Sequence, residues 1–179
     1  QLYLGLAHRG RDERPAALCA ARRAAEIGRL LSAPMLEAAG LTIQAVCAAD
    51  EPDPERARRL AWEAEQVERA PKPWLLAAQC VGAWTAGLGS EGPDVALLRQ
   101  LDSRLEAHRG TVEAYDLAAE FLLRALRSAG LEEASALSRR LEAEGRRRAE
   151  RIGQLDLAES MLSALSWNRV RADGRSGPR

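Results

Sequence analysis

The chain of 179 residues has few lysines and few aromatic residues. Lys72 is the only lysine, and aromatic residues make up 4%. The 26 basic residues are matched by 26 acidic ones, so the formal net charge is zero. Nucleic acids and anionic lipid surfaces attract proteins through a large positive field, so this balance argues against broad binding to either. The apolar content of 46% is enough for a folded core.

Long apolar runs are also missing. No stretch approaches the roughly 18 apolar residues of a membrane-spanning helix, and nothing resembles a cleavable secretory leader. We therefore expect a soluble, cytoplasmic domain without a membrane partner. The chain opens at Gln1 inside an apolar helical pattern, which indicates a segment of a longer protein.

Cysteine and histidine are too sparse to suggest a reaction. Cys19, Cys47 and Cys80 form no C-x-x-C pair of a zinc or redox site, and we predict buried, reduced thiols. His8 and His108 belong to no known catalytic frame and are predicted to be ordinary polar residues near helix ends. We expect no enzymatic activity, no metal site and no cofactor.

Helical spacing dominates the residues that are present. Leu117, Phe121, Leu122 and Leu126 recur three or four positions apart, as on an amphipathic helix. β-branched residues are few, and no stretch alternates cleanly as a strand would. Pro52-Asp53-Pro54 and Pro93-Asp94 predict helix starts with an aspartate N-cap. The fold class is therefore predicted to be all-α.

A pattern of small residues returns about every forty positions. Its successive sets are Ala17, Ala21 and Ala24; Ala57, Ala61 and Ala64; Ala96, Gln100 and Ser103; and Ala134, Ser138 and Leu141. A more apolar helix precedes each set, so the unit is a helical hairpin. Internal repeats of this length are typical of stacked arrays.

The repeats predict one domain over residues 1–167, followed by a disordered tail or linker over 168–179. The expected boundaries are 1–33, 35–70, 73–108 and 111–148, with a terminal helix at 153–167. Residues 132–165 could form one long helix or two, and the repeat length favours two.

Two segments resemble the tetratricopeptide pattern. Leu4-Gly5, His8, Ala17, Ala21 and Ala24 are similar to its second half, and Gly130-Leu131-Glu132-Glu133-Ala134 is similar to the turn and second-helix start, with Phe121 at the family's leucine place. The period is longer than in the family, and later units lose its aromatic and glycine signatures. Longer repeats of this kind resemble those of large bacterial signalling ATPases and transcription regulators.

The resemblance implies stacked antiparallel hairpins in a right-handed α-solenoid, whose first helices line a concave groove. The family's groove positions correspond to Thr42, Val46, Val81, Thr85, Asp116, Leu123 and Arg127. These are the predicted partner-binding residues. They lack the lysine and asparagine cluster with which family members hold a C-terminal carboxylate, which argues against a chaperone-tail receptor.

The segment Gly87-Leu88-Gly89-Ser90-Glu91-Gly92 matches the G-x-G-x-x-G spacing of phosphate-binding loops. A helical run rather than a strand precedes it, so the dinucleotide-binding context is absent. We predict a turn between two helices instead.

Charge is polarised along the chain. Residues 139–179 carry ten arginines against six acids, and residues 1–138 carry 16 basic against 20 acidic residues. Pairs such as Glu120 with Arg124 and Glu142 with Arg146 have the favourable i to i+4 order and predict a salt-bridged outer face. Head-to-tail self-association, or docking on the parent protein, is the alternative.

Trp62, Trp74 and Trp84 are expected to pack between hairpins, whereas an exposed tryptophan would be a natural anchor for a bound peptide. The predicted function is a protein-interaction or scaffolding repeat domain of a larger regulatory protein. The alternative is an effector-sensing repeat domain of an ATP-dependent bacterial transcription regulator, with a small ligand on its concave face. No direct nucleic-acid binding is expected.

Overall fold

A computed structural model describes residues 2–51, 53–90, 92–108 and 112–152, except the side chains of residues 112 and 113. Within these ranges all regular structure is helical, which confirms the all-α prediction for them. The helices are α1 (Leu2–Gly10), α2 (Arg14–Leu30), α3 (Pro34–Ala49), α4 (Pro54–Glu65), α5 (Lys72–Gly87), α6 (Val95–Glu106), α7 (Val112–Ser128) and α8 (Glu133–Ile152). None of the described helices is both long and apolar enough to cross a membrane.

The two predicted aspartate caps are present. The carboxylate of Asp53 accepts a hydrogen bond from the backbone N–H of Arg56 at 3.0 Å, and that of Asp94 accepts one from Leu97 at 3.0 Å. Each cap satisfies a backbone donor that the first turn of a helix leaves without a partner. These caps fix where α4 and α6 begin.

Helix packing is closest where the small residues lie. Ala17, Ala21 and Ala24 of α2 are buried, as are Ala57, Ala61 and Ala64 of α4. A Cβ added to Gly40 of α3 would lie 2.6 Å from the backbone nitrogen of Ala25 in α2. Short side chains therefore let the α2 and α3 backbones approach each other, as the pattern predicts.

The third set of small residues was aligned wrongly. Ala96, Gln100 and Ser103 are exposed on α6, and the residues that α6 buries are Leu98, Leu101 and Leu105. A shift of two positions on a helix turns the side chain by about 200°, so the small-residue set falls on the solvent side. In α8 the aligned Ala134 and Leu141 are buried.

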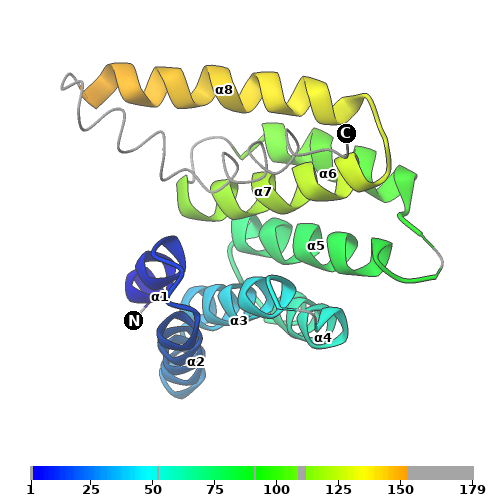
Figure 1. The fold of residues 1–179 in the computed structure, drawn as a ribbon. Coiled ribbons are helices and arrows are strands. Elements are labelled where there is room, and N and C mark those ends of the chain that lie inside the picture. The colour runs from blue at the N-terminus through cyan, green and yellow to red at the C-terminus, as the bar shows by residue number, and fades with distance from the viewer. Residues whose placement is uncertain (1, 52, 91, 109–111, 153–179) are drawn as a thin grey trace.

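Alternate helices pack beside one another, with α3 against α1 and α5, and α5 against α7 (Figure 1). Helix α7 also contacts α6 and α8, and it carries the large buried side chains Phe121, Leu122, Leu123 and Leu126. Most of its described residues are buried. Helix α8 runs without a break through Gly145 to Ile152, and the predicted terminal helix and tail lie outside the described residues.

Candidate functional site

The structure buries most of the residues predicted to bind a partner. Of Thr42, Val46, Val81, Thr85, Asp116, Leu123 and Arg127, only Asp116 and Arg127 keep appreciable exposure. The hydroxyl of Thr42 donates to the backbone oxygen of Ala38 at 2.8 Å, and that of Thr85 donates to Val81 at 3.0 Å. Both hydroxyls are thus satisfied inside their own helices. In this arrangement the five buried residues offer no surface to a partner.

A buried cluster of four charges joins three of the helices. The guanidinium of Arg9 in α1 donates to both carboxylate oxygens of Glu120 in α7, at 2.9 and 2.7 Å, and its Nε donates to Asp50 at 3.1 Å. Arg124 in α7 donates to Asp50 at 2.9 Å and to Glu120 at 2.7 Å. Asp50 caps the C-terminus of α3. Two arginines and two carboxylates therefore form a closed, charge-balanced ring.

Burial makes this cluster different from an ordinary surface ion pair. The side chains of Glu120 and Arg9 are 0% and 8% exposed. Burial alone would raise the pKa of Asp50, but Arg9 and Arg124 outweigh it and lower that pKa below its ordinary 3.8. Burial would lower the pKa of Arg9, but Glu120 and then Asp50 outweigh it and raise that pKa. The pKa shifts of Asp50 and Arg9 therefore both favour the charged form.

The cluster corrects the prediction that Glu120 and Arg124 lie on a solvated face. The i to i+4 pair forms, but inside the protein and against the ring of Phe121, whose centre lies 4.7 Å from the Arg124 guanidinium carbon. The spacing of residues within α7 cannot reveal that Arg9 of α1 also donates hydrogen bonds to Glu120. One feature of the sequence could have indicated that Glu120 is buried: it is an acidic residue inside the apolar stretch from Leu117 to Leu123.

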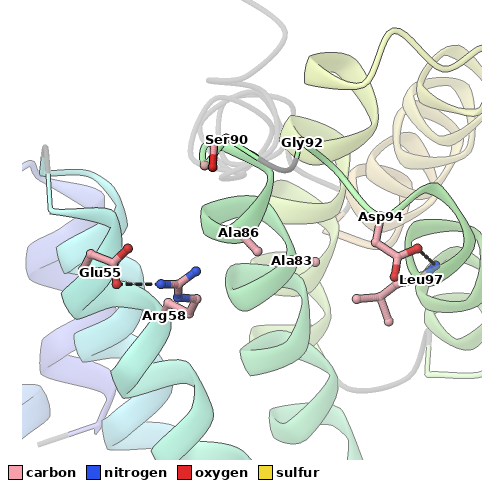
Figure 2. Close-up of a pocket in the computed structure, with 9 residues that line it drawn as sticks. Glu55, Arg58, Ala83, Ala86, Ser90, Gly92, Asp94 and Leu97 are labelled. Carbon is pink, nitrogen blue, oxygen red and sulfur yellow. Dashed lines mark hydrogen bonds and ion pairs between the residues drawn. The ribbon is translucent and has the colours of Figure 1, made fainter.

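An open groove lies between α4 and α6, with α5 as its floor (Figure 2). Two adjoining hollows of about 460 and 410 Å³ share Arg58, Ala83, Ala86 and Leu97. We call their union the α4–α6 groove. Its floor includes Gly82, Ala83 and Ala86, whose short side chains leave the space between the two flanking helices open.

A polar relay crosses one end of the α4–α6 groove. Arg104 of α6 donates to the side-chain oxygen of Gln79 at 2.7 Å, and the Gln79 amide donates to Glu65 of α4 at 3.2 Å. Burial raises the pKa of Glu65 above its ordinary 4.5, although Gln79 and Arg104 oppose the shift. At the other end Arg58 donates to Glu55 at 2.6 Å (Figure 2).

Trp62 stands at the edge of this groove, and its side chain is 61% exposed. The expectation that it packs between hairpins was wrong, because α4 buries Ala57, Leu60, Ala61 and Ala64, and Trp62 lies beside that face. Trp74 is buried and Trp84 packs partly buried against the core. Trp62 also lines a third hollow, of about 540 Å³, which is formed with the α2–α3 turn and residues 66–69 and shares no other lining residue with the α4–α6 groove.

Other predicted motifs have structural roles. Gly87 ends α5, and Gly89, Ser90 and Gly92 belong to the α5–α6 connection, so the phosphate-loop match is a turn as predicted.

Cys47 and Cys80 are buried, but Cys19 is exposed, which corrects the prediction for that thiol. The buried face of α2 is made by alanines and Gly28, and Cys19 lies off it. His8 pairs with Glu13 at the end of α1.

Within the described ranges no three histidine, cysteine or acidic side chains are grouped as a metal site would require. Comparison with protein-family models, curated proteins and solved structures finds no match to this chain. The geometry of the α4–α6 groove and the buried cluster is therefore the basis for a functional proposal.

Proposed function

We propose that the chain is a protein-interaction domain that binds a peptide or helix of another protein in the α4–α6 groove. The observation that carries this proposal is an exposed tryptophan, Trp62, beside a groove floored by small residues. Tryptophan loses little conformational entropy on binding and is enriched among residues that dominate interface energies. Leu97, which is 37% exposed on the opposite wall, supplies a second apolar contact.

A tetratricopeptide-like solenoid is the architecture we propose for the domain. The packing of alternate helices beside one another supports it, as do the buried small residues of α2 and α4. In this interpretation α1, α3, α5 and α7 are the first helices of four hairpins. The parent protein would be a larger regulatory chain, and its neighbouring domains are candidate partners together with separate proteins or a second copy.

The interaction function is tested with peptides selected from a displayed library on the folded chain. We expect the selected peptides to bind the wild-type chain and to weaken by at least about tenfold on Trp62→Ala, as when an interface anchor is truncated. Isothermal titration calorimetry measures the affinities, and circular dichroism checks that the variant is folded.

Tyr3→Ala is the matched control, because Tyr3 is a comparably exposed aromatic residue, at 69%, on α1. It should leave the affinity unchanged. Equal affinity for the wild type and Trp62→Ala would exclude the α4–α6 groove as the binding surface. Selection of no binding peptide would count against the interaction function itself.

The second candidate is sensing of a small effector. The volume of each hollow, between about 410 and 540 Å³, is within the range of small-molecule sites, and the Glu65–Gln79–Arg104 relay provides polar groups. A ligand that binds only the folded state raises the melting temperature. A thermal-shift screen of metabolites and nucleotides would show a stabilising compound in this case, and no shift if the chain binds only peptides.

A further inference from the structure

Some of the residues predicted to line a concave groove share a helix stripe with members of the charge cluster. Thr42, Val46 and Asp50 follow one another at four-residue intervals and therefore share a stripe of α3. Asp116, Glu120, Leu123, Arg124 and Arg127 likewise share a stripe of α7. Asp50 is bonded to Arg124, so the two stripes meet at the cluster.

Helix α1 packs mainly against α2, contacts α3 less, and adds Leu6 as a partly buried apolar contact with the core. Its buried residues are Leu2, Gly5 and Arg9, of which only Leu2 has a large apolar side chain. It has nine residues, fewer than the roughly 12 to 15 that an isolated helix needs for stability in water. The bonds from Arg9 to Glu120 and Asp50 are therefore its principal attachment to α7 and to the end of α3.

An ionic attachment is easier to reverse than an apolar one. When a buried apolar contact opens, its surface meets water at a free-energy cost proportional to area. When buried ions separate, they regain the hydration that burial had removed, which offsets much of the lost attraction. A cluster of two buried charges, Arg9 and Glu120, and two partly buried ones, Asp50 and Arg124, is thus less suited to a permanent core than to a contact that opens.

We propose that Arg9, Asp50, Glu120 and Arg124 form a latch that holds the end of α1 against α7 and against the end of α3. Opening of the latch separates the end of α1 from these two places while the rest of the domain stays folded. The latch residues belong to α1, α7 and the end of α3 and share none of the residues that line the α4–α6 groove, so this proposal is independent of the proposed peptide binding. The opening itself is measurable without any partner.

The three cysteines provide the measurement. Cys47 is buried on α3 three positions before Asp50, and burial raises its pKa to about 11, so it reacts only when exposed. Cys80 is buried on α5 and reports opening of the remaining core, while Cys19 is exposed and reports reagent activity. The full chain is treated with a thiol reagent, and mass spectrometry follows each cysteine.

In the wild type we expect Cys19 to react at once, Cys47 slowly and Cys80 more slowly still. Glu120→Gln should accelerate Cys47 by roughly tenfold or more, because bonds to a buried carboxylate are lost, and should leave Cys80 unchanged. Asp102→Asn is the matched control, since it removes an Arg140 pair between α6 and α8 and should leave Cys47 unaffected.

Arg9→Lys keeps the charge but loses the two-pronged geometry, so it serves if Glu120→Gln does not fold. It should accelerate Cys47 to a smaller extent. Equal rates for Cys47 and Cys80 would show that exposure requires global unfolding and would overturn the latch. An unchanged Cys47 rate in folded Glu120→Gln or Arg9→Lys would overturn it as well. Neither result depends on the peptide-binding test.

Discussion

Gly40 shows how one missing side chain sets the distance between two helices. A Cβ at this position would lie 2.6 Å from the Ala25 nitrogen and 2.7 Å from the Ala21 oxygen, both of them backbone atoms of α2. Backbone atoms cannot turn aside as the end of a flexible side chain can. Helices α2 and α3 must therefore separate to accept any larger residue at position 40.

We expect Gly40→Ala to lower the free energy of unfolding by at least about 1–3 kcal/mol, the usual cost of overpacking a core. Urea denaturation followed by circular dichroism measures the change. Gly82→Ala is the control, because its Cβ would meet only side-chain atoms at 3.8 and 3.9 Å. Helix propensity favours alanine there by roughly 1 kcal/mol. Equal effects of the two substitutions would contradict close packing at Gly40.

At the scale of the elements, helix ends were predictable because their signals are local. The Asp53 and Asp94 caps and the turn that follows Gly87 lie where their residues indicate. The buried face of α6 was not predictable from the repeat, since Ala96, Gln100 and Ser103 fit the spacing equally well on the exposed side. Residues at helical spacing form a stripe on one face of a helix wherever they occur. The packing of the neighbouring helices determines which face is buried.

The cap of α6 gives an element-scale prediction. Asp94→Ala removes the acceptor of the Leu97 N–H and should lower the free energy of unfolding by about 1 kcal/mol. Asp94→Asn keeps an oxygen acceptor and should be close to neutral. Thermal unfolding of the two variants measures the difference. A loss of the same size in Asp94→Asn would show that charge, and not capping, is responsible.

At the scale of the whole molecule, the charge cluster joins the first helix to the seventh. Repeat arrays ordinarily contact only neighbouring units. The bond between Arg9 and Glu120 spans 111 positions of sequence and adds a contact between distant hairpins. The free energy of unfolding should therefore respond to the ionisation of this cluster.

The lowered pKa of Asp50 predicts an acid-dependent stability. Its stabilising contribution is fully present above the unfolded pKa of about 3.8 and is lost as pH falls through the lower pKa of the folded state. Urea denaturation, repeated at pH values from about 6 down to about 2, should show that the free energy of unfolding declines toward the acid end of this range. Asp50→Asn should flatten the decline, although Glu65, whose pKa is raised, contributes in the opposite sense. An identical acid profile in Asp50→Asn would contradict this assignment.

The sequence by itself determined the helical class, the N-caps of α4 and α6 and the small-residue faces of α2 and α4, because each depends on residues within a few turns. Only the tertiary structure decided that Trp62 is exposed and that Glu120 and Arg124 lie inside. The spacing of Glu120 and Arg124 is the same on a solvated face and in a core. The environment of that pair is set by Arg9 and Asp50, which the fold brings from distant parts of the chain.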